Sequence, residues 1–204
     1  MTFAEFVLAQ LPRPPLRVLE VGCGREGGLV PALAEAGYDV LGIDPEAPEG
    51  PRYRRLELAE LDDPGPFGAV VAGRVLHHVH PLAAGLDKLA ALAPLLVVDE
   101  FAWNHIDQPT QAWYEGRRRA LVAAGGEPKG PPDLDEWRWA HPGLHPYETL
   151  RRELDARYAE RHAEWRPYFF RWLGDPETER LERDAIAAGE IRPIGFRYVG
   201  VSFG

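Results

Sequence analysis

The feature that most constrains this chain is a glycine-rich turn, VLEVGCGREGG at residues 18–28, between an apolar run and a helical pattern. Glycine has no Cβ, so such a turn can bend sharply and its backbone can approach a ligand closely. The next apolar run, residues 39–43, ends on Asp44, whose carboxylate can accept hydrogen bonds from ribose hydroxyls. A strand, a glycine turn, a helix and a second strand ending in an acidic residue together predict a site for an adenosine-containing cofactor.

Strand and helix patterns alternate through the first hundred residues. A helix is expected at residues 3–11, before the first strand. The expected strands are residues 17–21, 39–43, 53–58, 69–72 and 95–99, and the expected helices between them are residues 29–36 and 81–92. Strands that alternate with helices at this spacing predict an α/β fold with a parallel sheet and right-handed crossovers.

The pattern changes after Glu100, and all six tryptophans lie between Trp103 and Trp172. We interpret residues 1–100 as the cofactor-binding core and residues 101–145 as a cap or lid over the carboxyl edge of the sheet. Most of the tryptophans are expected to form the interior of that cap. Residues 146–204 are expected to complete the sheet, with helices at 146–156 and 176–188 and strands at 158–165 and 194–203.

Composition excludes several classes of protein. The 204 residues are 45% hydrophobic, enough for one domain, or for a domain with an inserted cap, around a real core. A net charge of -9 disfavours a nucleic-acid partner, whose phosphates call for a basic face. The run Arg117–Arg119 is the only stretch of three consecutive basic residues, and at helical spacing its side chains point in different directions, which is typical of a solvated helix surface. The lone Cys23 excludes a disulfide framework and a cysteine-cluster metal site. No signal peptide or membrane-length apolar stretch is recognised, so a cytoplasmic location without a membrane partner is expected.

The residue before the first glycine distinguishes two classes of cofactor. GCGREG also satisfies the G-x-G-x-x-G pattern of dinucleotide-binding enzymes. Glu20, however, lies on the strand just before Gly22, where a pyrophosphate would meet a second negative charge. A carboxylate suits a cofactor that carries an ammonium group and a sulfonium cation. Glu20 therefore favours S-adenosylmethionine over a nicotinamide dinucleotide.

Two motifs resemble those of the class I S-adenosylmethionine-dependent methyltransferases. Residues 20–24 match that family's first motif, an acidic residue, any residue and then Gly-x-Gly, and residues 69–82 (AVVAGRVLHHVHPL) resemble its fourth strand and following loop. The resemblance covers roughly residues 16–100 and the last strand. It implies a Rossmann-like methyltransferase fold: a mostly parallel seven-stranded sheet, an antiparallel C-terminal edge strand and an inserted aromatic-rich helical cap.

The resemblance also implies which residues bind the cofactor. Glu20 and the backbone from Gly22 to Gly24 would surround the methionine part, and Asp44 would hold the ribose. Leu58 stands where the family usually has an aspartate beside the adenine. The full expected set is Glu20, Gly22, Cys23, Gly24, Asp44, Pro45, Leu58, Ala59, Ala72 and Gly73.

In this fold the methyl acceptor enters over the carboxyl ends of strands four and five. The expected catalytic candidates there are Arg74, His78, Glu100 and His105. A neutral histidine is suited to remove a proton from a hydroxyl or ammonium acceptor. Structural alternatives remain open: the pair His77–His78 supports the helix that follows, and Arg74 either binds an acidic substrate or pairs with Glu100.

The sequence therefore predicts an S-adenosylmethionine-dependent methyltransferase that transfers a methyl group to an oxygen or nitrogen of a small organic molecule by in-line displacement. No metal is expected, because Gly73 and Arg74 stand where metal-assisted enzymes of similar fold need a carboxylate. Two alternatives stay open: a non-catalytic module that senses S-adenosylmethionine, and an NAD-dependent oxidoreductase. The acceptor's identity and the choice between monomer and homodimer are not determined by the sequence.

Overall fold

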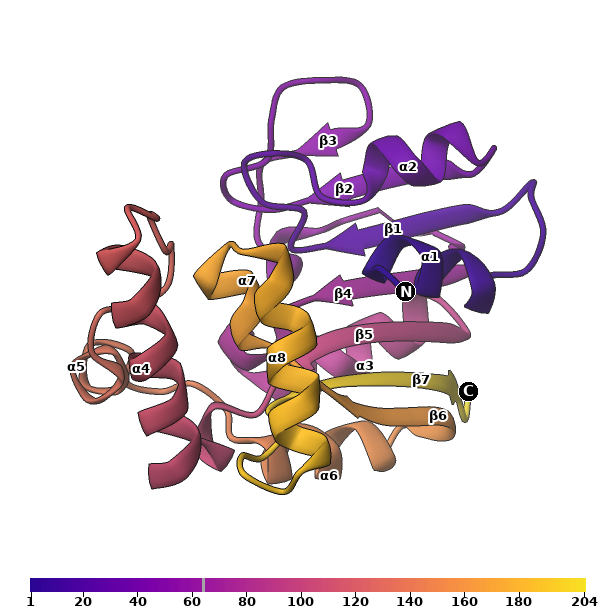
Figure 1. The fold of residues 1–204 in the computed structure, drawn as a ribbon. Coiled ribbons are helices and arrows are strands. Elements are labelled where there is room, and N and C mark those ends of the chain that lie inside the picture. Colours follow the sequence, from indigo (N-terminus) through magenta and orange to yellow (C-terminus); the bar gives the residue numbers. More distant parts are fainter. Residues whose placement is uncertain (64) are drawn as a thin grey trace. The chain divides into compact units, whose positions relative to one another are not determined.

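The strands form one seven-stranded sheet in the order β3-β2-β1-β4-β5-β7-β6 (Figure 1). The computed structural model describes residues 1–63 and 65–204. Its strands are β1 (Arg17–Val21), β2 (Asp39–Ile43), β3 (Tyr53–Arg54), β4 (Ala69–Gly73), β5 (Leu95–Phe101), β6 (Tyr158–Arg166) and β7 (Gly195–Ser202). Its α-helices are α1 (Phe3–Gln10), α2 (Val30–Glu35), α3 (Leu82–Leu92), α4 (Gln108–Ala123), α5 (Leu134–Ala140), α6 (Tyr147–Asp155), α7 (Phe169–Leu173) and α8 (Pro176–Ala187). Three short 3-10 turns are η1 (Leu58–Glu60), η2 (Leu76–His78) and η3 (Trp103–His105).

The first five strands are parallel. Leu19 of β1 lies opposite Leu41 of β2 on one side and Val70 of β4 on the other, and the pairs β2–β3 and β4–β5 are parallel as well. The parallel core expected from the alternating patterns is therefore confirmed. Because parallel strands end at the same edge, the segments that follow Val21 and Ile43 come together there.

One strand of the sheet, β7, runs against its neighbours. Figure 1 draws β7 in the direction opposite to β1 and β4. Ser202 N–H donates to the Pro94 carbonyl (2.8 Å) and Phe203 N–H to the Arg157 carbonyl (3.0 Å), so the end of β7 meets the starts of β5 and β6. A strand whose end meets the starts of both neighbours runs opposite to both, so β7 is the antiparallel strand expected at the C-terminal end of the chain, but it does not form the edge of the sheet. The final strand, β7, lies beside β5, and β6 forms the outer edge.

Helices α1 and α2 cover one face of the sheet, while α3 lies behind the strands in Figure 1. Phe6 of α1, Leu33 of α2 and Val40 of β2 belong to one core cluster, and all three are nearly fully buried. Parallel strands covered on both faces read as continuous apolar runs, as β4 does here. α1 begins with a capping box, in which Glu5 N–H donates to Thr2 Oγ1 (3.2 Å) and Thr2 N–H donates to Glu5 Oε2 (2.7 Å).

The third strand is shorter than the sequence pattern predicts. A strand is expected over residues 53–58, whereas β3 comprises only Tyr53 and Arg54. Glu57 N–H donates to Glu60 Oε2 (2.8 Å), which closes a capping box and starts η1. The hydrogen bond from the side chain therefore turns the chain at residue 57, although the weak alternation of apolar and polar residues favoured a strand that continues to residue 58.

The chain divides into two compact units. The sheet unit comprises residues 1–100, 148–163 and 197–204, and the aromatic unit comprises residues 101–147 and 164–196. The division expected from the sequence placed residues 101–145 in a cap and all of 146–204 with the sheet. The observed division differs because residues 164–196 pack with 101–147.

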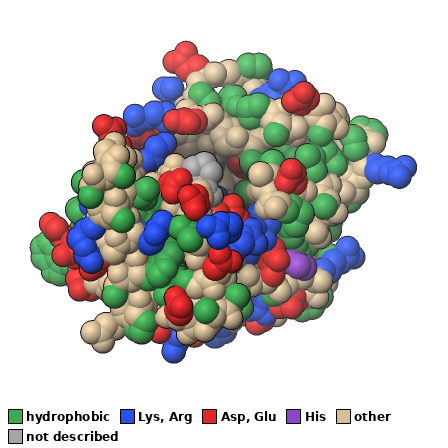
Figure 2. Space-filling view, viewed as in Figure 1, with side chains coloured by type: hydrophobic (Ala, Val, Ile, Leu, Met, Phe, Trp, Pro, Cys, Tyr) green, Lys and Arg blue, Asp and Glu red, His purple; other side chains and the backbone are tan. Residues whose placement is uncertain are grey.

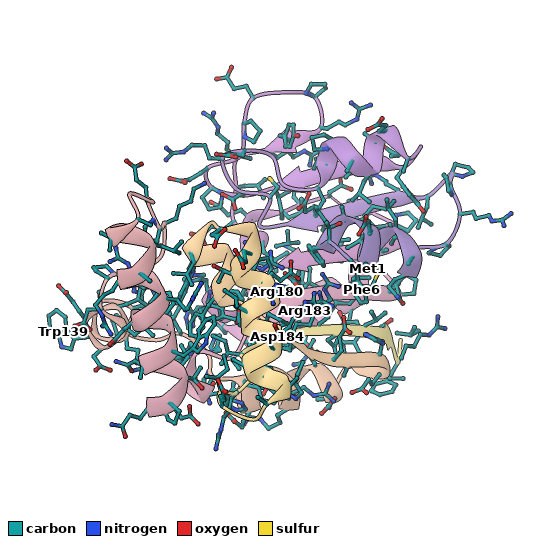
Figure 3. The ribbon with its side chains drawn as sticks, in the orientation of Figure 1. Met1, Phe6, Trp139, Arg180, Arg183 and Asp184 are labelled. Atoms are coloured by element: carbon teal, nitrogen blue, oxygen red, sulfur yellow. The ribbon has the colours of Figure 1, made fainter. Side chains whose placement is uncertain are left out.

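Ring stacking holds the two segments of the aromatic unit together. Tyr114 of α4 lies 4.6 Å from Phe169 of α7, centroid to centroid, and Phe101 stacks on Tyr168 at 4.4 Å with an interplanar angle of 12°. The tryptophans that pack against this cluster are Trp103, Trp113, Trp137 and Trp172. The tryptophans therefore pack around the cluster while only partly buried, and its buried interior is made of smaller rings and aliphatic side chains, in contrast to the expectation. Trp139 is the contrast, because it is 85% exposed and projects from α5 (Figure 3).

Charged side chains are dispersed over the surface. On the face shown in Figure 2, acidic and basic groups are interspersed. Helix α8 shows the pattern at residue level, since Arg180 pairs with both Glu177 (3.0 Å) and Asp184 (2.8 Å) on its exposed side (Figure 3). Of the helices within residues 1–63 and 65–204, none combines the length and the apolar character that crossing a bilayer requires.

A buried ion pair joins β7 to β5. Arg197 Nε lies 3.2 Å from Asp99 Oδ1, and the two residues are only 1% and 5% exposed. Arg197 Nη2 also donates to the Met1 carbonyl (3.3 Å), and its guanidinium lies 4.6 Å from the centroid of the Phe6 ring. The ion pair therefore ties the N-terminal segment, whose Met1 and Phe6 are labelled in Figure 3, to the interior of the sheet unit.

Asp99→Ala is expected to lower the free energy of unfolding by about 3–5 kcal/mol, because it leaves the Arg197 charge buried without its partner. Asp184→Ala is the matched control: it removes one exposed partner of Arg180 and should cost less than about 1 kcal/mol. Chemical denaturation followed by circular dichroism measures both losses. Equal losses in the two variants would contradict the assigned role of the buried pair.

Candidate functional site

A cavity of about 490 Å³ opens in the sheet unit at the carboxyl ends of β1 and β2. This volume lies within the range of small-molecule and cofactor sites. Most of the wall is apolar and includes Ile43, Pro45, Leu56, Leu58, Val79 and Ala84. The polar side chains in the wall are Asp44, Glu57, His78, His80 and Lys88.

The glycine-rich turn forms one end of this cavity. Gly22 and Cys23 both donate their N–H groups to the Ile43 carbonyl (2.9 and 3.3 Å), which pulls the turn onto the end of β2. Gly22 has φ +80°, and a Cβ there would lie 2.6 Å from Val75 Cβ. Only glycine therefore permits this backbone to lie between Val75 and the cavity.

Glu20 supports the turn from beneath. It is 4% exposed, and its two carboxylate oxygens lie 2.9 and 2.8 Å from the Leu29 N–H nitrogen, at the start of α2. A Cβ on Gly28 would lie 2.3 Å from Glu20 Oε1, so the glycine is required for this approach. Burial raises the pKa of Glu20 to about 7, against the opposing effects of the Leu29 and Val30 N–H groups and the Arg74 charge.

Half of the predicted cofactor-binding residues line the cavity directly. Asp44 is half-buried at the end of β2, and its Oδ1 accepts from Glu46 N–H (2.7 Å), which orients the carboxylate. On the facing wall, Lys88 Nζ donates to the Ala59 carbonyl (2.8 Å) and so holds the η1 turn. The predicted residues in the wall are Gly22, Asp44, Pro45, Leu58 and Ala59.

The other predicted cofactor-binding residues lie outside the wall, as far as the described residues define it: Glu20, Cys23, Gly24, Ala72 and Gly73. Cys23 is 4% exposed, and burial raises the pKa of its thiol to about 12. Ala72 is fully buried in β4, and a Cβ on Gly73 would lie 3.1 Å from the Phe3 ring.

The loop after β4 carries two of the predicted catalytic residues. Arg74 has a left-handed backbone (φ 56°), and its N–H donates to the Asp99 carbonyl (2.6 Å). Its side chain is exposed. Four residues further on, His78 is exposed and lines the cavity.

Glu100, the third candidate, is 1% exposed and faces the same loop from the end of β5. Its Oε1 accepts from Leu76 N–H (2.6 Å), and its Oε2 lies 2.6 Å from His77 Nδ1. His77 is itself only 4% exposed. The structure thus gives the two adjacent histidines different surroundings: His77 is a buried partner of Glu100, and His78 faces the cavity.

His105, the fourth candidate, belongs to the aromatic unit and is half-buried. Its ring stacks on Trp165 (5.3 Å between centroids, 26°) and meets Tyr147 edge-on (5.1 Å, 63°). The structure therefore gathers Arg74, His78 and Glu100 in the sheet unit and places His105 in a separate ring cluster.

Sequence reasoning missed the part of the wall that α3 contributes. Ala84, Gly85 and Lys88 line the cavity from one face of this helix. Their helical spacing, and the position of a glycine among them, were the available signals. A Cβ on Gly85 would lie 2.5 Å from Val79 Cγ1, so the glycine permits close packing of the loop on the helix.

Comparisons with known proteins identify relatives of this chain. A family model described as "Methyltransferase domain" matches residues 2–157. A curated relative, the ubiquinone biosynthesis O-methyltransferase of Rhodopseudomonas palustris (strain TIE-1), is 33% identical over 90 residues, which cover 38% of this chain and 35% of the relative. The chain thus spans about a third of the length of the curated relative that it matches.

Two solved structures share the fold. An S-adenosylmethionine-dependent methyltransferase from Mesorhizobium loti superposes with a TM-score of 0.60 at 21% identity, over 97% of each chain. The 1,6-didemethyltoxoflavin-N1-methyltransferase of Burkholderia thailandensis, solved with 1,6-didemethyltoxoflavin and S-adenosylhomocysteine, gives a TM-score of 0.60 at 18% identity, over 98% of this chain and 76% of the other.

The raised pKa of Glu20 predicts a pH dependence of stability. Since the pKa rises from 4.5 to about 7 on folding, the native chain binds a proton more tightly than the unfolded chain across this interval. The contribution of Glu20 to the free energy of unfolding is therefore fully present below about pH 4.5 and is lost as the pH rises through about 7.

Glu20→Gln keeps an acceptor for Leu29 N–H and removes this titration. The stability of the variant relative to the parent chain should rise between about pH 5 and about pH 7.5, measured by denaturation at both values. Glu26→Gln, the same change at an exposed position of the same turn, is the control. A stability difference that stays constant with pH in Glu20→Gln would refute the assignment.

Proposed function

The chain belongs to the methyltransferase domain family, and from this premise we propose that it is an S-adenosylmethionine-dependent methyltransferase that methylates an oxygen or nitrogen of a small organic molecule. The observation that carries the proposal is the cavity at the carboxyl edge of the sheet, with Asp44 on one wall and His78 on the loop after β4. Membership of the family also agrees with the resemblance that the motif at residues 20–24 indicates.

The residues of the cavity fit an adenosine cofactor with an amino-acid tail. Asp44 offers a carboxylate acceptor to ribose hydroxyls, and Leu58 and Ala59 offer an apolar wall to the adenine ring. Gly22 exposes backbone without a side chain, which suits the methionine part. Glu20 lies just beneath this turn and offers a buried carboxylate to a cationic tail held there.

When bound, the cofactor supplies a methyl carbon that its sulfonium has already activated. The protein's contribution is to align the acceptor and to exclude water, a positioning effect worth up to about 7–11 kcal/mol when the geometry is ideal. His78 is placed to take the proton that a hydroxyl or ammonium acceptor loses, because it is exposed and lines the cavity. Imidazole is suited to this role near neutral pH.

The names of the relatives support a small-molecule acceptor. The curated relative methylates oxygen in ubiquinone biosynthesis, and the Burkholderia thailandensis protein is an N1-methyltransferase. The net charge of -9 favours such an acceptor over a nucleic acid, whose phosphates call for a basic face.

Incubation with methyl-labelled S-adenosylmethionine and a panel of phenols, quinols and nitrogen heterocycles tests the activity. The parent chain should transfer label, and Asp44→Ala should bind S-adenosylhomocysteine at least about tenfold more weakly, equal to about 1.4 kcal/mol, by calorimetry. Glu49→Ala, an exposed change shortly after β2, should leave the affinity unaltered. Tight binding without transfer to any acceptor would favour a sensor, and unchanged binding in Asp44→Ala would refute the ribose contact.

A further inference from the structure

The 3-10 turn η2, which carries His77 and His78, lacks a cap of its own. The residue before the turn is Val75, and its side chain makes no capping hydrogen bond. Glu100 from the neighbouring strand provides the cap instead: its Oε1 accepts from Leu76 N–H (2.6 Å) and from His77 N–H (3.4 Å). The position of η2 therefore depends on a buried side chain that lies more than twenty residues away in the sequence.

The same carboxylate orients the imidazole of His77. Oε2 of Glu100 lies 2.6 Å from His77 Nδ1, and the two side chains are 0% and 5% exposed. The hydrogen bond between Nδ1 and the carboxylate oxygen holds the plane of the ring, and the tautomer with its hydrogen on Nδ1 is the one that donates to a carboxylate. Buried carboxylates persist when such partners satisfy them, which explains why Glu100 is tolerated in the core.

The oriented ring of His77 contacts the ring of His78. The two centroids are 4.1 Å apart, with an interplanar angle of 42°. His78 is exposed and lines the cavity, whereas neither Glu100 nor His77 belongs to the wall formed by the described residues. A chain of contacts thus runs from Glu100 through His77 to the one member of the group that faces the cavity.

We propose that Glu100 and His77 are positioning residues for methyl transfer, which together hold the His78 imidazole at the cavity wall. The inference rests on the proposed function, in which His78 takes the proton of the acceptor. It assigns Glu100 a role different from direct catalysis, because both of its oxygens face the η2 turn.

Glu100→Gln separates this role from simple stabilisation. The amide oxygen can still accept from Leu76 N–H, but the amide nitrogen must donate to His77 Nδ1, which moves the hydrogen of the neutral His77 ring to Nε2. Nitrogen NMR of histidine-labelled protein reports the tautomer of each ring. In Glu100→Gln we expect His77 to change tautomer and the ring resonances of His78 to move with it.

The kinetic expectation is a loss of turnover without a loss of cofactor binding. The kcat of Glu100→Gln should fall at least about tenfold, while the Kd of S-adenosylhomocysteine stays within about twofold. Asp63→Asn is the matched control, because Asp63 is a buried carboxylate that accepts from Arg17 Nη2 (2.8 Å) and Gly65 N–H (3.0 Å) at the opposite end of β1. Its kcat and its His78 resonances should match those of the parent chain.

A second variant keeps the proposal testable if Glu100→Gln does not fold. His77→Asn retains an amide donor for Glu100 and deletes the ring that contacts His78, so it should show the same loss of kcat with cofactor affinity retained. Unmoved His78 resonances, or a kcat within about twofold of the parent in either folded variant, would overturn the proposal. Should the parent chain transfer no methyl group at all, the proposed activity fails, while the NMR comparison still decides whether Glu100 and His77 position His78.

Discussion

The site depends on buried glutamates that accept hydrogen bonds from the backbone of neighbouring loops. Glu20 of β1 accepts from Leu29 N–H beneath the glycine-rich turn, and Glu100 of β5 accepts from Leu76 N–H beneath the loop after β4. A buried carboxylate or N–H group without a partner is costly, so each pair fixes the two elements that contribute to it. The aromatic unit repeats the device, since Glu182 accepts from the N–H groups at the start of α7. Rigid loops at the carboxyl edge follow from these pairs.

This arrangement changes the physical reason for preferring one cofactor class. From the sequence, the Glu20 charge is expected to act directly on a ligand, repelling a diphosphate and attracting a cationic tail. In the structure, Glu20 occupies the N–H of Leu29 at the start of α2, the type of donor with which dinucleotide-binding folds hold a pyrophosphate. A diphosphate is therefore disfavoured for two reasons: the Leu29 N–H that would bind it already donates to Glu20, and the Glu20 charge repels it. A raised pKa makes the carboxylate partly neutral near pH 7, so a nearby cation would favour its ionised form.

Local patterns predicted the parallel core, because strand and helix periodicity and the glycine turn act over a few residues. The same reasoning predicted Asp44 and His78 as site residues, and both line the cavity. It could not find the contact between Glu100 and His77, because nothing local signals a hydrogen bond between two distant segments. Nor could it join residues 164–196 to 101–147, since ring contacts such as that between Tyr114 and Phe169 depend on tertiary packing. The predicted third strand is too long because the capping box at Glu57 starts a 3-10 turn, and this local hydrogen bonding overrides the weak alternation of apolar and polar residues.

The central claim is that the cavity beside Asp44 and His78 holds S-adenosylmethionine above a turn anchored by Glu20. A crystal structure of the protein soaked with S-adenosylhomocysteine tests it most directly. The account predicts ribose hydroxyls at the Asp44 carboxylate, the sulfur on the side of the cavity that His78 lines, and Glu20 still hydrogen-bonded to Leu29 N–H. Density for the ligand elsewhere, or a protein that takes up NAD in this cavity while excluding S-adenosylhomocysteine, would contradict it.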